Sequence, residues 1–232
     1  MDQFLEISKE QEIAETKRFF VRVYGWMTLA LIITGLTAFK TAASPEVIQF
    51  IFGTRFVFYG LLISELILVG TLAGAIHKMT AVTATIIFAL YSVLNGLTLA
   101  SIFFIFTAQS IANVFFIAAG TFAAMSAYGY LTKKDLSKMG NIMIMALIGL
   151  IIASVVNIFL KSEMLYWISS YVGVLIFVGL IAYDTQKLKK MNVMGNEGTD
   201  EDKKEAIIGA LTLYLDFINL FLFLLRIFGR RK

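Results

Sequence analysis

Three carboxyl side chains lie in stretches of the sequence that are otherwise apolar enough to cross a membrane. These are Glu65, Asp184 and Asp216, three of the 16 acidic residues in the chain. A carboxylate at the centre of a bilayer costs roughly 2.5–3.5 kcal/mol on insertion scales, so such residues usually pair with another group and mark a functional site. These three positions are therefore the candidate functional residues of the chain.

Asp184 and Asp216 are predicted to lie close together. Asp184 follows the apolar run 167–183, and the sequence contains no helix breaker before Lys190. A helix that continues to Lys190 places Asp184 about 9 Å from its end, and Asp216 is about 15 Å into the next apolar run, 206–228. Because consecutive membrane helices run antiparallel, the two carboxyl groups are expected at similar depth.

A carboxyl pair of this kind has two chemical uses. Two adjoining carboxyl groups in a low-dielectric site cannot both ionise at low cost, so they share a proton and titrate together, which makes them a proton sensor. With Asn219 and backbone carbonyls, paired carboxylates also supply the hard oxygen ligands that Ca²⁺ prefers. Asp184 and Asp216 are therefore a candidate calcium site. The alternative is that each acid is only hydrogen-bonded within the helix bundle.

The segment that carries Asp216 has small and polar residues at helical spacing. They form one stripe, made of Gly209, Thr212, Asp216, Asn219 and Arg226. The other faces are apolar, with Leu211, Leu213, Phe217, Leu222 and Leu224. This pattern predicts a helix near the centre of the bundle, with its polar stripe toward protein or water and its apolar faces outside.

Other polar residues are candidates for supporting roles. His77 and Lys78 close the apolar stretch 56–76, at whose middle Glu65 lies, and they would contact the aspartate pair if the helices adjoin. The alternative for His77 is contact with lipid headgroups, although the pKa of a histidine suits a switch. Small and polar side chains are also what membrane helices use to associate, so helix packing is the prediction for Gly70, Gly74, Tyr91, Asn95 and Thr98.

The elements that must position these residues follow from composition. Of 232 residues, 59% are hydrophobic and 16% are charged, against about 45–50% and about 25% in soluble domains. The chain is therefore predicted to be an all-α polytopic membrane protein with the lipid bilayer as its first partner. Stretches of about 20 apolar residues span a bilayer, and seven qualify: 21–39, 56–76, 81–106, 111–131, 141–160, 167–189 and 206–228.

These spans leave no room for a soluble domain. We expect a cytoplasmic N-terminal segment, residues 1–20, followed by one seven-helix transmembrane domain, residues 21–232. A cytoplasmic N-terminus places 12 of the 20 basic residues inside and six outside, as the positive-inside rule favours. The glycines and acidic run of the stretch 192–204 predict a solvated cytoplasmic loop.

Several kinds of chemistry are excluded. The chain has no Cys and one His, which removes disulfides, thiol nucleophiles and the usual zinc and haem sites. There is no glycine-rich phosphate loop or serine nucleophile motif, and no cofactor is expected. Basic residues follow the loops and form no face of their own, so nucleic acid is not an expected partner.

Four stretches resemble the Bax inhibitor family, also called the transmembrane Bax-inhibitor-motif family. They are GVLIFVGLIAYDTQKLKK (173–190), GALTLYLDFINLFLFLLRIFG (209–229), VYGWMTLAL (23–31) and SAYGYLTKKDLSKMGN (126–141). The resemblance covers nearly the whole chain and is closest to bacterial inner-membrane members. It implies six helices around a central seventh, and a pH-sensitive calcium leak that is governed by an aspartate pair at the positions of Asp184 and Asp216.

The family pattern also has an acid and a basic residue in the second span. Glu65 matches the acid by placement. The stretch 56–76 contains no Arg, and only His77 and Lys78 follow it, so the basic partner is missing here or built differently.

Two other functions compete with the leak, which as a transporter would not be an enzyme. One is an interaction protein that modulates a membrane protease or a stress response through its helices, without intrinsic transport. The other is an intramembrane aspartyl protease, in which two carboxyl groups activate water. The proteases share a Gly-x-Gly-Asp motif and a Pro-Ala-Leu motif, whereas this chain has Leu-Tyr-Leu before Asp216 and its single proline, Pro45, is predicted in a loop.

Overall fold

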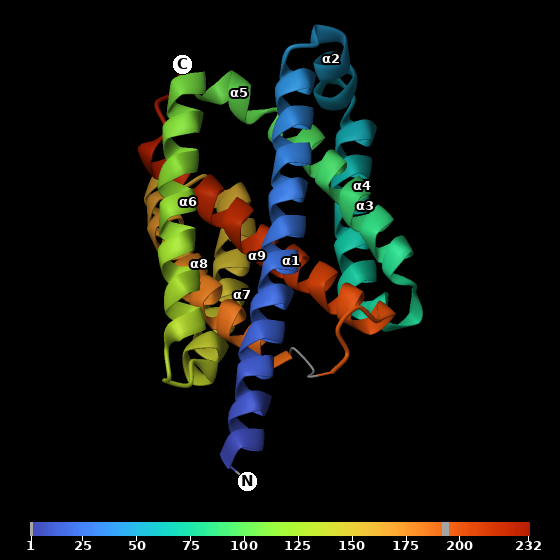
Figure 1. Ribbon diagram of the computed structural model, residues 1–232. Coiled ribbons are helices and arrows are strands. Elements are labelled where there is room, and N and C mark those ends of the chain that lie inside the picture. Colours follow the sequence, from blue (N-terminus) through green and yellow to red (C-terminus); the bar gives the residue numbers. More distant parts are fainter. Residues whose placement is uncertain (1, 192–194) are drawn as a thin grey trace. The chain divides into compact units, whose positions relative to one another are not determined.

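A computed structural model describes residues 2–191 and 195–232, with side chains from residue 10 onward. The described residues form nine α-helices and one 3-10 turn, labelled in Figure 1. They are α1 Asp2–Ala42, α2 Pro45–Gly53, α3 Arg55–Ala75, the 3-10 turn η1 Ile76–Lys78, α4 Ala81–Leu99, α5 Ile102–Ile105, α6 Ala108–Leu131, α7 Ser137–Leu160, α8 Glu163–Met191 and α9 Asp200–Phe228.

Seven stretches of the described residues are long and apolar enough to cross a membrane. They are Glu10–Ala42, Arg55–Lys78, Ala81–Ile105, Ala108–Leu131, Ser137–Leu160, Glu163–Met191 and Asp200–Phe228. Each overlaps one of the seven predicted spans, and most extend further at one or both ends. The prediction of an all-α polytopic membrane protein is confirmed.

The chain divides into two compact units. The first comprises Met1–Phe104 and Lys189–Leu211, and the second comprises Ile105–Leu188 and Thr212–Lys232. Helices α8 and α9 contribute to both, because the boundary crosses each of them. The organisation of residues 21–232 as one domain, with residues 1–20 as a separate segment, stays a prediction, as does the central position of the last helix.

In the first unit, α1 and α4 cross closely enough to require a glycine. A Cβ atom on Gly96 would lie 2.7 Å from the carbonyl oxygen of Thr34, a distance that no side chain tolerates. One turn earlier on α4, the Thr34 hydroxyl donates a hydrogen bond to the carbonyl oxygen of Ser92 over 2.9 Å. Small residues let membrane helices approach, and a hydroxyl then joins them.

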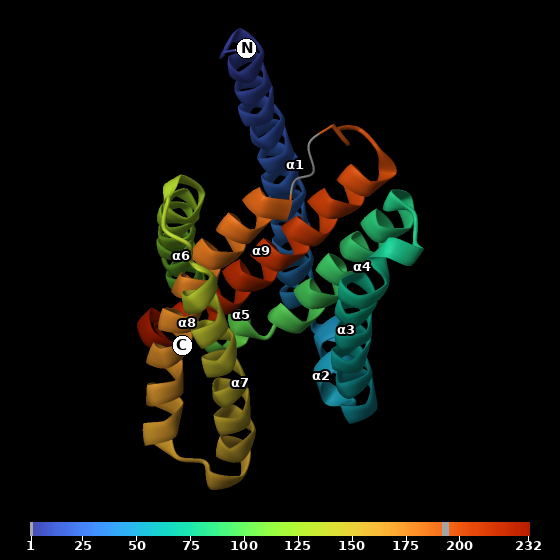
Figure 2. The same cartoon turned by 90° about the horizontal axis from the view of Figure 1, so that it is seen from below.

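In the second unit, α7 and α8 lie side by side, joined by a short connection (Figures 1 and 2). Gly140 of α7 faces the Tyr183 ring of α8, and Gly179 of α8 faces Met143 of α7. On α9, the ring of Phe217 meets Phe115 and Phe122 of α6 edge to face, with centroids 5.3 and 5.7 Å apart. Edge-to-face geometry is favourable for aromatic pairs.

The apolar faces of α9 are largely buried, whereas the sequence predicted that they lie outside. Leu211, Leu213, Phe217 and Leu224 are all at most 5% exposed, and Leu222 is intermediate. The prediction was wrong because lipid tails and protein interiors favour the same apolar side chains, so hydropathy does not separate a lipid-facing surface from a buried one.

The predicted loop 192–204 is shorter in the structure. Helix α9 begins at Asp200, so the acidic residues Asp200, Glu201 and Asp202 form its first turn, where carboxylates are favoured by the helix dipole. Asp202 is 1% exposed and not solvated. Positions 192–194 of the predicted loop lie outside the described residues.

Two smaller predictions also fail. Pro45 is the first residue of helix α2 and not a loop residue, a position that suits proline because the first turn needs no N–H partner. Gly70 and Gly74 were expected to pack against another helix, but a Cβ on either would meet nothing within 4 Å among the described residues.

Candidate functional site

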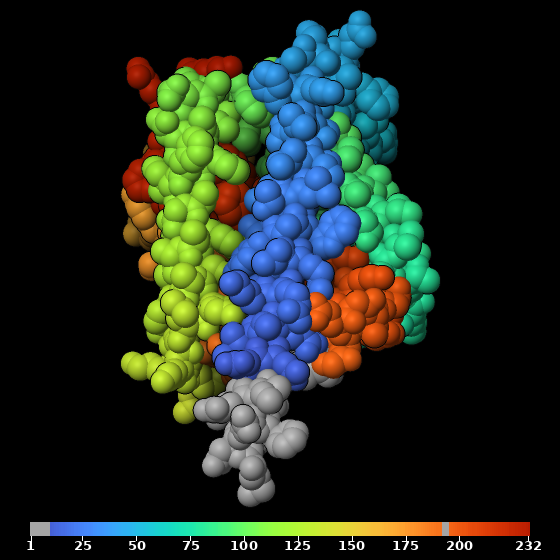
Figure 3. All heavy atoms as spheres, viewed as in Figure 1, coloured from blue at the N-terminus to red at the C-terminus, as the bar shows by residue number. Residues whose placement is uncertain are grey.

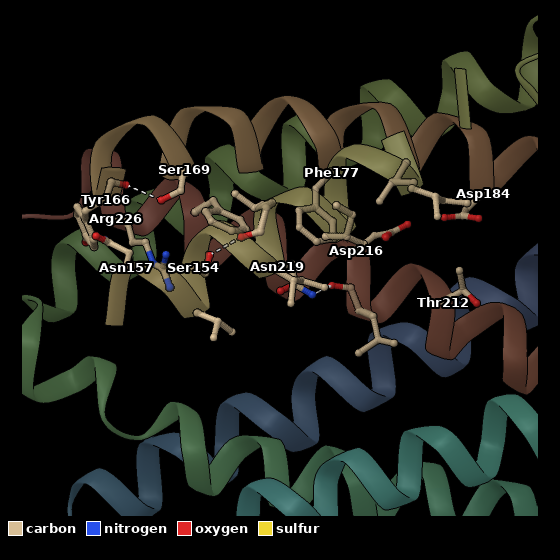
Figure 4. Close-up of a pocket in the computed structure, with 18 of the residues that line it drawn as sticks. Ser154, Asn157, Tyr166, Ser169, Phe177, Asp184, Thr212, Asp216, Asn219 and Arg226 are labelled. Carbon is tan, nitrogen blue, oxygen red and sulfur yellow. Dashed lines mark hydrogen bonds between the residues drawn. The ribbon is translucent and has the colours of Figure 1, made fainter. Parts of the chain in front are cut away.

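Asp184 of α8 and Asp216 of α9 are brought together in the second unit. Their carboxyl groups lie close enough to act on each other directly, and Figure 4 shows the Asp216 side chain extending toward Asp184. Asp216 is 5% exposed, and its Oδ2 atom is buried with no hydrogen-bond partner among the described residues. The positive charge of Lys187, one turn further along α8, acts on Asp184.

Two close helix contacts fix this part of α8. Gly129 of α6 abuts the backbone of Ala182, and Gly140 of α7 abuts the ring of Tyr183, with no room for a Cβ at either glycine. Asp184 is the next residue, and α8 continues through it to Met191. The position of Asp184 is therefore set by contacts of the two residues before it, Ala182 through its backbone and Tyr183 through its ring.

Polar side chains next to Asp184 connect α8 to its neighbours. The hydroxyls of Thr185 and Ser126 are 2.9 Å apart. The Gln186 amide accepts a hydrogen bond from the Leu136 N–H and donates one to the Lys134 carbonyl oxygen, each over 2.8 Å. These residues were not predicted, although the run Thr185-Gln186 after Asp184 was a signal that polar partners lie there.

A cavity of about 840 Å³ opens beside the aspartate pair, within the second unit (Figure 4). Residues of α7, α8 and α9 line it, most of them apolar. The lining is Ile144, Leu147, Leu150, Ile151, Ser154, Val155, Asn157 and Ile158 from α7; Tyr166, Ser169, Phe177, Leu180 and Asp184 from α8; and Thr212, Leu215, Asp216, Asn219, Phe223 and Arg226 from α9.

The polar stripe of α9 faces this cavity. Thr212, Asp216, Asn219 and Arg226 all line it, whereas Gly209 lies outside the lining. The Asn219 amide donates a hydrogen bond to the Leu215 carbonyl oxygen over 2.8 Å. At the far end, the Arg226 guanidinium lies 5.8 Å from the ring centre of Tyr166 and 5.1 Å from that of Phe223, within the range of cation–π attraction.

Glu65 lies in the first unit, on α3. Its carboxylate accepts hydrogen bonds from the Thr98 hydroxyl and, over 3.4 Å, from the Asn95 amide, both on α4. Two of the three residues predicted for helix packing in 81–106, Asn95 and Thr98, thus bond this acid. His77 and Lys78 are exposed on the turn η1 of the same unit, and their contact with the aspartate pair stays a prediction.

A second charged cluster, which the sequence did not predict, joins α1 to the connection before α9 and to the first turn of α9. Arg18 donates two hydrogen bonds to the Glu197 carboxylate, over 2.6 and 2.8 Å, and Arg22 donates one to buried Asp202 over 2.7 Å. The hydrogen bond from Arg18 holds the pKa of Glu197 below its usual value. Figure 3 shows the start of α9 against α1. We call these four residues the α1 clamp.

The described residues contain no group of three or more His, Cys, Asp or Glu side chains that could hold a metal. A calcium ion at Asp184 and Asp216 would thus have two carboxylates, and its remaining ligands would have to be neutral oxygens or water. Ca²⁺ accepts such mixed oxygen ligands, and the sparse set favours transient over tight binding.

Comparisons with known proteins agree on one family. Residues 16–232 match the family described as inhibitor of apoptosis-promoting Bax1. The inner membrane protein YbhL of Escherichia coli K12 is 52% identical over 223 residues, covering 96% of this chain and 95% of YbhL. An uncharacterized protein of Borreliella burgdorferi is 44% identical over 224 residues, 97% of either chain. RP147, an uncharacterized protein of Rickettsia prowazekii, is 44% identical over 223 residues, covering 93% of this chain and 91% of its own.

Both the length of the match and the identity to an inner membrane protein agree with the seven apolar helices, so the chain is an integral protein of the inner membrane. The relatives' names state no enzymatic activity, and the prediction that the chain is not an enzyme stays a prediction. The chain belongs to the Bax inhibitor family.

Proposed function

We propose that the protein is a pH-dependent cation leak, with calcium as the transported ion and the Asp184–Asp216 pair as its gate. The observation that carries this proposal is the pair itself: two carboxyl groups that act on each other at the wall of a cavity, one of them 5% exposed. An ionisable residue inside a membrane helix is energetically costly, so such residues usually pair with another group and mark an ion or proton pathway.

The gate works by charge. With one proton shared, the two carboxyl groups hold α8 and α9 together. As pH rises and that proton leaves, two negative charges in a poorly solvated site repel each other and attract a cation, so α9 shifts. Among the residues that line the cavity, Arg226 is the cationic one and lies ten residues from Asp216 along α9. Lys187 acts on Asp184 from the same helix.

The test is calcium flux into liposomes that contain only this protein, measured from about pH 5 to pH 8. We expect flux to rise with pH in the unaltered protein. Asp184→Asn and Asp216→Asn each remove one titrating group and should abolish the pH dependence. Glu163→Gln is the matched control, because Glu163 is an exposed carboxylate at the start of α8, outside the cavity lining. An unchanged flux and pH response in both Asn variants would overturn the proposal.

The competing functions predict different experimental results. Cleavage of a transmembrane peptide that is lost in Asp216→Ala would indicate an aspartyl protease. Specific capture of a membrane protease by crosslinking, with no flux at any pH, would indicate an interaction protein. A cytoplasmic N-terminus places the α1 clamp on the cytoplasmic side in either case, and this orientation is part of the proposal.

A further inference from the structure

The cavity beside the aspartate pair is far larger than a metal ion requires. Its volume of about 840 Å³ falls in the range of small-molecule sites, roughly 300–1,000 Å³. Its wall consists mainly of branched aliphatic and aromatic side chains from α7, α8 and α9. An apolar wall with a few convergent polar groups is typical of a site for an organic ligand, whereas a hydrated metal ion gains nothing from such a wall.

The polar groups are distributed unequally along the cavity. At one end lie the carboxyl groups of Asp184 and Asp216, and Asp216 Oδ2 is buried without a partner among the described residues. Once the proton that the two carboxyl groups share has left, this oxygen has no donor among the described residues, and a ligand that carries a positive charge or an N–H donor offsets the cost of burying it.

Aromatic rings lie next to the carboxyl groups. Figure 4 shows Phe177 beside Asp216, and the Phe177 ring stacks on that of Phe223 with centroids 5.9 Å apart. Phe177 and Phe223 both line the cavity. A carboxylate together with aromatic faces is the combination that recognises organic ammonium groups.

The charge at the opposite end of the cavity determines how a ligand is oriented in it. Arg226 is ten residues from Asp216 along α9, about 15 Å at 1.5 Å per residue. Its guanidinium, which lies beside the rings of Tyr166 and Phe223, repels a second positive charge. The cavity therefore fits one cationic group at the aspartate end with an apolar body that extends toward Arg226.

We propose that this cavity is a binding site for an amphipathic organic cation, an amine or ammonium compound with an apolar body. The proposal does not require that the protein conducts metal ions, because binding needs only the cavity and its carboxylates. Its occupant would compete with a cation for Asp216.

The test uses tetraphenylphosphonium as the probe and tetraphenylborate as its control of the same shape and opposite charge. Binding is measured without calcium, on protein in phosphatidylcholine nanodiscs. Above the binding to empty nanodiscs, we expect saturable, stoichiometric binding of tetraphenylphosphonium and no binding of tetraphenylborate. Asp216→Asn should weaken phosphonium binding at least about tenfold, since an ionic partner is lost from a poorly solvated site.

A cavity-filling pair of variants separates the cavity from the charge. Ser154→Trp places a large side chain into the lining, whereas Ile148→Trp changes an exposed residue of the same helix outside it. We expect Ser154→Trp to lose phosphonium binding and Ile148→Trp to retain it. Both variants should elute as a single folded species. The proposal is overturned by equal binding of phosphonium and borate, by binding equal to that of empty nanodiscs, or by affinity unchanged in both Asp216→Asn and Ser154→Trp.

The two proposals fail separately. Saturable phosphonium binding without pH-dependent calcium flux supports the organic-cation site and contradicts the leak. Flux that depends on both aspartates, without phosphonium binding, supports the leak and contradicts the organic-cation site.

Discussion

Glu65 shows how a single acidic residue is accommodated within an apolar helix. It is half-buried on α3, and two side chains of α4, Thr98 and Asn95, donate hydrogen bonds to it. A hydrogen bond to a charged group contributes about 1.5–3 kcal/mol, and a buried acceptor that loses its donor incurs a desolvation cost of about 1–3 kcal/mol. The stability of the α3–α4 pair therefore depends on these two donors.

Thr98→Val tests that dependence. Valine has nearly the shape of threonine without the hydroxyl, so it leaves Glu65 with the longer bond from Asn95 and should lower the free energy of unfolding by about 1–3 kcal/mol. Thr85→Val on the same helix is the control, because the Thr85 hydroxyl donates to the Ala81 carbonyl of its own helix. Equal unfolding transitions of the two variants in detergent would contradict the role of Thr98.

At the scale of residues, the sequence reveals costly groups more readily than their partners. Asp184 and Asp216 could be singled out because a charge in a membrane helix is expensive wherever it lies. Ser126, Thr185 and Gln186 carry a weaker signal, because hydroxyl and amide side chains in helices often bond to their own backbone and carry no such cost. The cavity was also beyond prediction, since it depends on how three helices diverge.

Helix crossings depend on single glycines. On α6, Gly129 abuts the Ala182 backbone of α8, whereas a Cβ on Gly120 of the same helix would meet nothing within 4 Å among the described residues. The spacing of glycines alone does not show which of them lies at a crossing. That is why Gly70 and Gly74 were misassigned and Gly129 was not singled out.

Gly129→Ala should push α6 away from α8 and lower the melting temperature, because the new methyl group collides with backbone, which cannot move aside as a side chain can. Gly120→Ala should be neutral or slightly stabilising, since alanine is about 1 kcal/mol better than glycine within a helix. The measurement is thermal unfolding of both purified variants. Equal melting temperatures would contradict the close α6–α8 contact.

The α1 clamp combines a buried and an exposed ion pair. The Asp202 side chain is 1% exposed, while that of Arg18 is 56% exposed. Exposed pairs contribute little and are screened by salt. A buried carboxylate that loses its cation incurs a much larger cost.

Arg22→Ala should therefore destabilise the protein by about 3–5 kcal/mol, and Arg18→Ala by much less, because its ion pair is exposed to solvent. Chemical unfolding of both variants in detergent checks the difference. If Arg18→Ala were the more damaging of the two, the assignment of Asp202 as the buried partner of Arg22 would be wrong.

Acid also weakens the clamp, with a defined sign. The pKa of Glu197 is lowered by Arg18 in the folded state. The contribution of this ion pair to folding stability is therefore fully present above the ordinary pKa of a glutamate. That contribution is lost as pH falls through the lowered pKa. The clamp is therefore intact at neutral pH.

For the molecule as a whole, the sequence predicts the number of membrane helices well, because seven long apolar runs leave few other assignments. The ends of the helices were less predictable. Helix α9 starts at Asp200 and not near residue 206, since the charged first turn that continues it carries no hydropathy signal. Orientation likewise rests on the distribution of charge, with 12 basic residues on one predicted side and six on the other.

The absence of cysteine from the sequence makes this orientation directly measurable. Lys133→Cys and Lys40→Cys each introduce one exposed thiol, on opposite predicted sides of the membrane. A membrane-impermeant maleimide should label Lys40→Cys on intact cells, and Lys133→Cys only after the cytoplasmic face is opened. The reverse pattern would place the N-terminus outside.

Both carboxyl groups of the pair lie on α8 and α9, after five other membrane-length helices. Because a chain is synthesised and inserted from its N-terminus, a partly made molecule contains neither aspartate until most of the bundle has entered the bilayer. A ribosome that stalls before α8 leaves a fragment without the charged site. Any ion permeability that depends on both carboxyl groups is therefore acquired only near the end of biosynthesis.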